Sequence, residues 1–389
     1  MAPRLSRRRL LQGAGLAAFL GGSAAVLPQF ELEGAKQTPQ SCPSTDLSAS
    51  EHELIISNWP AYIDPRSNTS STFNVFQEQT GITVTYTDDV NDNIEFFGKI
   101  VNQMRACESV DRDMFMLTDW MAARMINLGW LQRLDHANIP NVDANLLPAL
   151  QSPPWDPNRD YSAPWQSGLT GIAYNAGVTD PVGSFSELLT RSDLKGRVTM
   201  LTEMRDTMLF MLLVVGADPL DFTDDDWNNA LDYLSAAVSD GQIRAFTGNE
   251  YLRGLKSGDI AACEAWSGDV IQAQFEDPNI KFVQPEEGLA LWSDNMLVPN
   301  RADHKANAEE WMNYYYDPIV AAKLAAWVNY ICPVAGAQEA MEKVDPSLVD
   351  NKLIFPTPEF LAQAKTMMPL TESQTQTYEN DWTNLLTGG

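Results

Sequence analysis

The feature that most constrains the fold is a regular alternation of strand-like and helix-like segments that begins at Leu54. The run ELIISNW is typical of a buried strand, SSTFNVFQEQTG of an amphipathic helix that ends at Gly81, and ITVTYT of the next strand. The same order continues through GRVTML, EYLRGLKSG and IAACEAW to LALWSDNMLVP. This alternation predicts an α/β fold with mostly parallel strands in two lobes, and 389 residues suffice for two domains.

The N-terminal segment is typical of an export signal. Arg7, Arg8 and Arg9 precede an apolar run from Leu10 to about Leu27. The pattern predicts a signal peptide over residues 1–30 that resembles the twin-arginine type, although Leu10 stands where Phe is common. An uncleaved anchor helix is the alternative. Residues 31–50, rich in Ser, Thr and Pro, are predicted to be a linker. We therefore expect a periplasmic, cell-surface or extracellular protein.

Four cysteines in an exported chain favour disulfides. Cys42 and Cys107 both precede strands of the first half, whereas Cys263 and Cys332 both fall in the later part. Of the three possible pairings we expect Cys42–Cys107 and Cys263–Cys332. Cys42 as a lipid anchor is a second interpretation, but TPQSC lacks the apolar residue at −3 that lipidation requires.

The formal net charge of −26 excludes several classes of partner. Nucleic acid is not expected, because binding to phosphates needs a basic surface. The field of the protein attracts a cationic ligand and repels an anionic one. Solubility or adaptation to salt would also account for the total, so only acids placed beside aromatic rings indicate a ligand.

The motifs of common enzymes are missing. None of the three histidines lies near a predicted strand end, and there is no G-x-S-x-G, H-E-x-x-H, P-loop or dinucleotide fingerprint. We expect no metal, no cofactor and no catalysis. A glycosidase-like enzyme stays open, because it needs only two carboxylates among Glu203, Asp206 and Asp294. The acidic run DDVNDN at 88–93 resembles a calcium loop, but it lacks the glycine at position six and favours a helix start.

Aromatic and acidic residues follow five of the predicted strands. Ligands of α/β proteins bind at the carboxyl ends of strands. The residues at these ends are Trp59 and Tyr62; Thr118, Asp119 and Trp120; Thr202, Glu203, Arg205 and Asp206; Trp266 and Asp269; and Trp292 and Asp294. Rings attract cations, and a carboxylate accepts charge-assisted hydrogen bonds from an ammonium group. Acids among rings therefore predict an aliphatic amine rather than a sugar, which would need neutral partners.

Several segments resemble bacterial spermidine/putrescine-binding proteins. They are SNWPAYI, LTDWMAARMINLGWLQRLD, DYSAPW, LTEMRD, EAWSGD, LALWSDNMLVP and VNYICPVAGA, in the family's order over about residues 53–385. The resemblance implies a type II periplasmic-binding-protein fold, with residues 51–165 and 293–337 in lobe 1 and residues 166–292 and 338–389 in lobe 2. It also implies a monomeric receptor that delivers a polyamine to the permease of an ABC importer, meets the membrane only through its signal or an anchor, and catalyses nothing.

The resemblance also implies roles for individual residues. Glu203, Asp206 and Asp294 match acids that hold amines, and the segment near 291–295 matches a hinge strand. The matching rings and hydroxyl are Trp59, Tyr62, Thr118, Trp120, Trp266, Trp292 and Tyr330. Pro60 and Ala61 stand where the family can carry an acid, so one amine contact is missing and the preferred polyamine is open. Other solutes also stay open: a sugar, thiamine, an amino-acid-like amine, or ferric iron bound by the tyrosines at 314–316.

Overall fold

The structure is a computed structural model that describes residues 42–388, which belong to one compact unit. The predicted signal peptide and the first part of the predicted linker lie outside this range. No helix within residues 42–388 is long and apolar enough to cross a membrane.

A single nine-stranded sheet runs through the described residues, in the order β2-β1-β3-β9-β4-β7-β5-β6, with β8 paired to β4. The strands are β1 (Glu53–Asn58), β2 (Thr83–Asp88), β3 (Met114–Thr118), β4 (Ala163–Asn175), β5 (Val198–Leu201), β6 (Ile243–Thr247), β7 (Ala262–Trp266), β8 (Ile280–Val283) and β9 (Ala290–Leu297).

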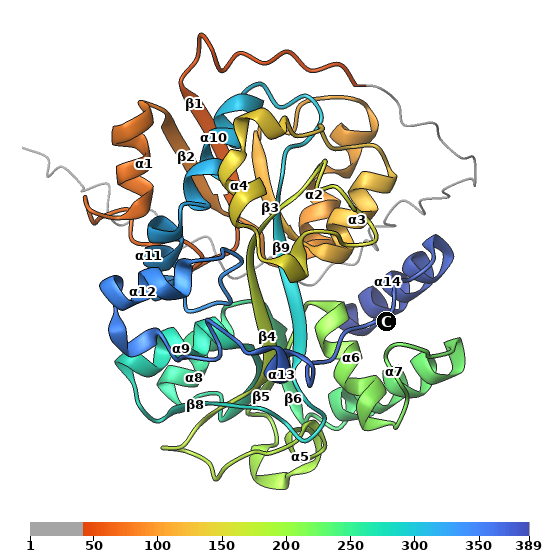
Figure 1. Cartoon of the computed structure of the whole chain (residues 1–389). Helices are drawn as coiled ribbons and strands as arrows, with labels where there is room; N and C mark the ends of the chain where they lie inside the picture. Colours follow the sequence, from red (N-terminus) through yellow and green to blue (C-terminus); the bar gives the residue numbers. More distant parts are fainter. Residues whose placement is uncertain (1–41, 389) are drawn as a thin grey trace, which may run out of the picture. The chain divides into compact units, whose positions relative to one another are not determined.

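The helices cover the sheet from both ends. They are α1 (Thr72–Thr80), α2 (Asn93–Arg105), α3 (Asp119–Asn127), α4 (Pro140–Asn145), α5 (Phe185–Thr190), α6 (Met204–Val214), α7 (Asp224–Ser239), α8 (Tyr251–Ser257), α9 (Ser267–Glu276), α10 (Lys305–Tyr315), α11 (Pro318–Val328), α12 (Ala337–Val344), α13 (Pro358–Leu361) and α14 (Glu372–Thr387). Helices α1 to α4 and α10 surround the β1–β3 end, and α5 to α8 surround the β5–β6 end (Figure 1).

Strands β4 and β9 form a long antiparallel pair that joins the two ends of the sheet (Figure 1). Their register runs from Ala163 opposite Met296 to Thr170 opposite Ala290, and every residue of β4 is buried. The expectation of mostly parallel strands is wrong for the middle of the sheet, because β3–β9, β4–β7 and β4–β8 are antiparallel as well. Apolar patterns along a strand depend on burial and not on the direction of its neighbour, so the sequence does not encode this reversal.

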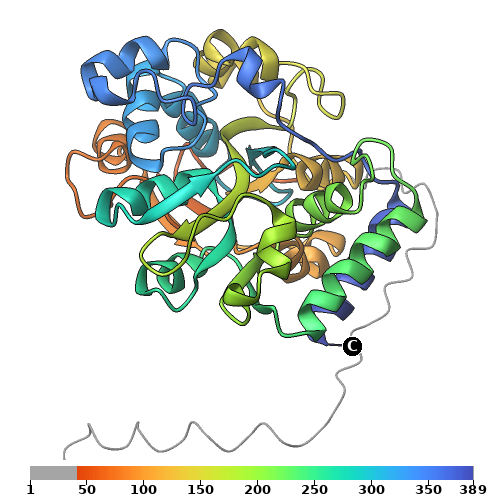
Figure 2. The same ribbon diagram turned by 90° about the horizontal axis from the view of Figure 1, so that it is seen from below.

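Each end of the sheet has its own aromatic core. At the β1–β3 end, Trp311 of α10 packs against Phe76 of α1, with 5.1 Å between ring centroids. At the other end, Trp227 of α7 stacks on Tyr378 of α14 at 3.9 Å, and Figure 2 shows the two helices side by side. The last helix of the chain therefore completes the core at the β5–β6 end.

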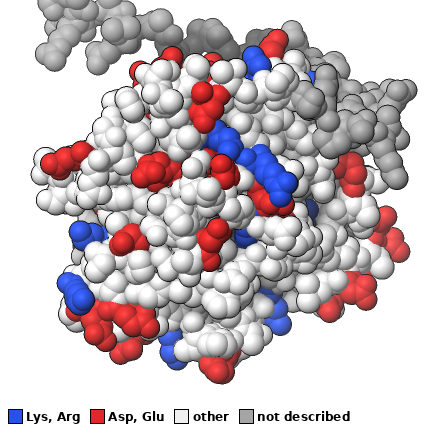
Figure 3. Space-filling model, turned by 45° about the horizontal axis from the view of Figure 1, so that its top comes forward, with Lys and Arg blue, Asp and Glu red and all other residues white. Residues whose placement is uncertain are grey.

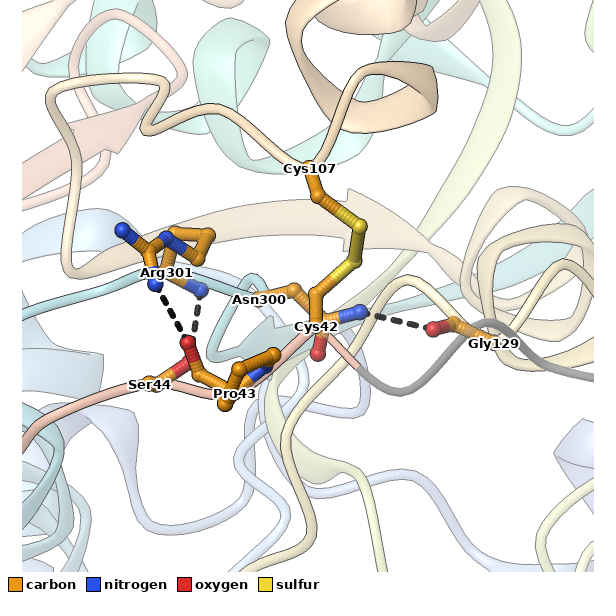
Figure 4. Close-up of a disulfide and its surroundings, with 7 residues drawn as sticks. All are labelled: Cys42, Pro43, Ser44, Cys107, Gly129, Asn300 and Arg301. Carbon is orange, nitrogen blue, oxygen red and sulfur yellow. Dashed lines mark hydrogen bonds between the residues drawn. A yellow bond between two sulfur atoms is a disulfide. The ribbon is translucent and has the colours of Figure 1, made fainter.

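A disulfide joins Cys42 to Cys107, as predicted (Figure 4). The residues after Cys42 lie along the connection from β9 to α10: the backbone N–H of Arg301 donates to the hydroxyl of Ser44 at 2.7 Å, and that of Asn307 to Ser48 at 3.2 Å. The final part of the predicted linker is thus held to the body of the protein by the disulfide and by hydrogen bonds.

The second predicted disulfide is wrong, because Cys263 and Cys332 are both free. Cys263 lies inside the sheet, with Ala173 of β4 on one side and Thr199 of β5 on the other. Cys332 lies between α11 and α12, where its backbone N–H donates to Ile354. Burial raises the pKa of both thiols, which stay protonated and serve as small core side chains.

Replacing both Cys42 and Cys107 with Ser should lower the free energy of unfolding by about 2–4 kcal/mol, because the bond closes a loop of 65 residues in the unfolded chain. Urea unfolding of the two proteins measures the difference. Reduction of the wild type should reproduce the loss, and the same reductant should leave the double variant unchanged. Equal stability of the wild type and the double variant would contradict the expectation.

Candidate functional site

One cavity, whose space of about 900 Å³ includes open solvent at its mouth, lies between several strand ends and the middle of β9. All ten residues that the sequence nominated for ligand binding line it: Trp59, Tyr62, Thr118, Trp120, Glu203, Asp206, Trp266, Trp292, Asp294 and Tyr330. Residues that are 271 positions apart in the chain therefore share one site. Whether they bind a ligand is not decided by this placement and is taken up below.

The strand pair β4–β9 brings the opposite walls together. Asp294 lies opposite Thr118 of β3, and Trp292 lies opposite Gly168 of β4. Alternate residues of a strand face the same side. Trp292 and Asp294 therefore both reach the cavity, while the hydroxyl of Ser293 between them pairs with that of Ser167 at 2.8 Å.

Aromatic rings form two groups in the cavity wall. Tyr330 contacts Tyr62 edge-on with 4.9 Å between centroids, and Trp292 with 5.6 Å. Trp59 and Trp266 meet edge-on at 5.7 Å. The indole N–H of Trp59 donates to the backbone of Met116 at 3.1 Å, which fixes this ring. The rings leave apolar faces available to a solute that has methylene groups.

Two glycines make room for these rings. A Cβ atom at Gly168 would overlap the ring of Trp292, and one at Gly268 would overlap the ring of Tyr330. Neither glycine has a positive φ, so close approach of a ring to the backbone is what requires a glycine here. The sequence gives no signal for this role, because it depends on a ring from a distant segment.

Two buried carboxyl groups of the cavity form no ion pair within residues 42–388, although Glu203 lies near enough to Arg205 to oppose the fall in the pKa of that guanidinium. Burial raises the pKa of Asp294 to about 8, and the neighbouring hydroxyls of Tyr62 and Thr118 partly oppose the rise. Burial, with Asp92 and Asp206 nearby, raises the pKa of Glu203 to about 8. Among the described residues, Oδ1 of Asp294 and Oε1 of Glu203 have no hydrogen-bond partner. Both oxygens are buried and lack the hydrogen bond that a buried carboxyl oxygen normally accepts.

Asp206 is hydrogen-bonded to Trp266 directly and to Trp292 through Thr170. Its Oδ2 accepts from the indole N–H of Trp266 at 2.8 Å and from the hydroxyl of Thr170 at 2.7 Å. Thr170 in turn accepts from the indole N–H of Trp292 at 3.0 Å. Burial raises the pKa of Asp206 to about 6. This carboxylate therefore orients the rings on both sides of it.

The cavity wall contains residues that the family resemblance did not match to the site, although the strand-end pattern named Asp119 and Arg205. They are Pro60, Asp119, Arg205, Leu209, Asn249, Ala290, Leu291, Thr366 and Met367. Asp119 and Arg205 come soon after β3 and β5, so their position after a strand could have assigned them to the site. Thr366 and Met367 come from the segment before α14, which has no strand pattern. The guanidinium of Arg205 lies 5.0 Å from the ring of Trp120 and keeps a positive charge, although burial lowers its pKa to about 10.

Metal binding has no support among the described residues. The tyrosines at 314–316 do not line the cavity, and their hydroxyls bind Thr72 and Pro164. No group of three or more metal-ligating side chains occurs within residues 42–388. In the acidic run at 88–93, Asp92 accepts the backbone N–H of Glu95 and caps α2. This confirms the helix start that the sequence favoured.

The unliganded protein should lose stability as the pH rises from about 4 to about 8. The pKa of Asp294 and of Glu203 is about 8 in the folded state and lower in the unfolded chain. The free energy of unfolding is therefore highest below the unfolded-state pKa, and it falls as the pH rises to the folded-state pKa. The loss is at most about 1.4 kcal/mol per pH unit for each group.

The Asp294→Asn variant should lose less stability over this interval, because it removes one of the two groups. Urea unfolding at about pH 5 and about pH 8 measures both slopes. Identical slopes in wild type and variant would show that Asp294 does not titrate in this way.

Comparison with known proteins gives matches over most of the chain. The sequence model of bacterial extracellular solute-binding proteins matches residues 72–355. The putrescine-binding periplasmic protein PotF of Escherichia coli is 28% identical over 364 residues, which cover 88% of this chain and 93% of PotF.

Solved structures share the fold. That of a putative spermidine/putrescine ABC transporter from Listeria monocytogenes matches with a TM-score of 0.76 and 23% identity, covering 87% of this chain and 100% of the other. AgtB from A. tumefaciens R10, solved in complex with agropinic acid, matches with a TM-score of 0.68 and 18% identity over 86% of this chain and 98% of the other. The expected periplasmic-binding-protein fold is confirmed.

Proposed function

The chain belongs to the bacterial extracellular solute-binding proteins, and we propose that it is the receptor of an ABC importer for an aliphatic polyamine. Such a protein binds and releases its solute unchanged, in agreement with the expectation that the chain is not an enzyme. The permease of the importer is then its partner, and it works as an exported monomer. One observation carries the proposal: in one cavity, buried carboxyl groups that each have an oxygen without a hydrogen-bond partner among residues 42–388 lie among aromatic rings.

The charges of the cavity favour a cation. Four carboxyl groups line it, from Asp119, Glu203, Asp206 and Asp294, against the single guanidinium of Arg205. Burying an unpaired carboxylate costs free energy, and an ammonium group that donates to it offsets this cost. Acidic side chains also outnumber basic ones in the sequence and are spread over the face shown in Figure 3, so the field attracts cations.

The site residues divide into acceptors and walls. Asp294 accepts from one ammonium group of the solute, and Oε1 of Glu203 accepts from a second. Trp292, Tyr330 and Tyr62 form one aromatic wall along the methylene chain, and Trp59 and Trp266 form a second. Thr118 and Trp120 complete the wall, and Asp206 fixes Trp266 and Trp292 through its hydrogen bonds. PotF is named a putrescine-binding protein, which supports a diamine as a ligand.

Arg205 favours a second candidate, an amine that also carries a carboxylate. Its buried guanidinium lines the cavity, and its Nε has no partner among residues 42–388. A guanidinium binds carboxylates with good geometry. A solute with an ammonium group at Asp294 and a carboxylate at Arg205 would use both charges, and AgtB shows that this fold accommodates agropinic acid.

Isothermal titration with putrescine, spermidine, agmatine, 4-aminobutyrate and a neutral sugar tests the proposal. We expect an amine to bind and Asp294→Asn to weaken it by about 10- to 100-fold, the value of one charged hydrogen bond. The Asp232→Asn variant changes an exposed acid of α7 and should bind like the wild type. If the folded protein binds none of the amines, the polyamine function is refuted. Binding of 4-aminobutyrate alone, lost in Arg205→Gln, would establish the second candidate.

Amine binding should release protons at neutral pH. Asp294 and Glu203 have pKa values of about 8 in the empty site, and an ammonium group requires them ionised. Affinity should therefore rise between about pH 6 and about pH 8 by up to about tenfold per unit for each group. Titrations in two buffers of different ionisation enthalpy count the released protons. Binding without release in the wild type would show that both carboxyl groups are already ionised.

A further inference from the structure

The segment Asn91–Asn93, part of the acidic run at 88–93, connects the two ends of the sheet beside the cavity. Asn93 is the first residue of α2, and Glu203 follows β5 at the other end of the sheet. The backbone N–H of Asn93 donates to Oε2 of Glu203 at 3.1 Å, and its side-chain amide donates to the same oxygen at 2.9 Å. The carboxylate that offers Oε1 to the cavity is therefore held through Oε2 from the opposite side.

The amide of Asn93 also binds the wall that carries Asp294. It donates to the hydroxyl of Thr118 at 2.6 Å, and its oxygen accepts the backbone N–H of Thr118 at 3.1 Å. Thr118 lies opposite Asp294 in the sheet. Asn93 is fully buried and does not line the cavity. It thus joins the two walls without occupying the place of a solute.

A second contact involves the end of β6. A Cβ atom at Gly248 would overlap the side-chain oxygen of Asn91. The φ of Gly248 is not positive, so the proximity of Asn91 is the reason that a side chain would not fit. Asn91 and Gly248 lie outside the cavity lining as well.

These contacts have to break when a solute enters. The cavity is walled by both ends of the sheet, and the side chains of Tyr62, Asp294 and Tyr330 are at most 3% exposed. The opening of the cavity to solvent does not expose these three side chains, so a solute that reaches Asp294 needs the walls to separate around the β4–β9 pair. We propose that residues 91–93 are a clasp that forms when the site closes, with Asn93 as a positioning residue that links Glu203 to Thr118 and slows release of the solute. The inference rests on the proposed function only in assuming that a solute binds in this cavity.

Three variants test the clasp. Asn93→Ala removes the bridge, and Gly248→Ala forces Asn91 away without removing a hydrogen bond. The double variant Asn91→Ala/Gly248→Ala removes the overlapping side-chain atoms and leaves only the backbone oxygen of Asn91, 3.0 Å from the new Cβ atom, so it should restore most of the closure. Gly98→Ala in α2 is the matched control, because a Cβ atom there meets no atom within 4 Å.

Stopped-flow fluorescence gives the solute's rate constants. We expect Asn93→Ala and Gly248→Ala to release the bound amine about tenfold faster or more, with association changed by less than about threefold, because contacts of the closed state act mainly on dissociation. The double variant should return toward the wild-type rate, and Gly98→Ala should match it. A residue that acts only on folding would not change dissociation more than association, and the double variant would not restore its dissociation rate.

Spin labels at exposed positions 102 of α2 and 232 of α7 measure closure directly, in protein without added solute. Gly248→Ala and Asn93→Ala should shift the distance distribution to longer values, and the double variant should reverse the shift of Gly248→Ala. Unchanged distances and unchanged dissociation would overturn the clasp. Absence of amine binding in the wild type would refute the polyamine function instead, and the distance measurement would still decide the clasp.

Discussion

The antiparallel pairing of β4 with β9 is the interaction on which the rest of the structure depends. It connects two ends of a sheet whose cores are built by different helices, around Trp311 at one end and Trp227 at the other. It also sets the register that places Trp292 opposite Gly168 and Asp294 opposite Thr118. A slip of one residue would turn Trp292 and Asp294 away from the cavity and bring Ser293 into it, because the side chains of a strand alternate.

The cavity concentrates unfavourable burial of charge at one place. Asp294 and Glu203 each leave an oxygen without a partner among residues 42–388, and burial raises their pKa values to about 8. Behind them Glu264, also fully buried, accepts from Thr207 and Leu201, and its pKa is raised as well. Groups that destabilise the empty protein are often kept for function. Here a cationic solute would reduce the cost of these groups, so ligand binding and folding stability are coupled.

Much of the site could be predicted because its chemistry is local to strand ends. The pattern of each strand places its last residue at the edge where loops gather, and Trp59, Thr118 and Trp266 follow directly from that rule. The capping box of Thr223 and Asp226 at the start of α7 is a local feature of the same kind. The free thiols of Cys263 and Cys332 show the opposite case, since a pairing depends on distance in space and not on position in the chain.

The sequence by itself determined the α/β class and four of the strand ends that carry rings and acids. Periodicity and residue chemistry decide these features within short segments. The tertiary structure alone decided the antiparallel centre of the sheet, the pairing of the cysteines, the need for glycine at 168 and 268, the position of Met367 in the wall, and the bridge from Asn93 to Glu203. Each of these is a contact between segments far apart in the chain, and only the packed fold sets such distances.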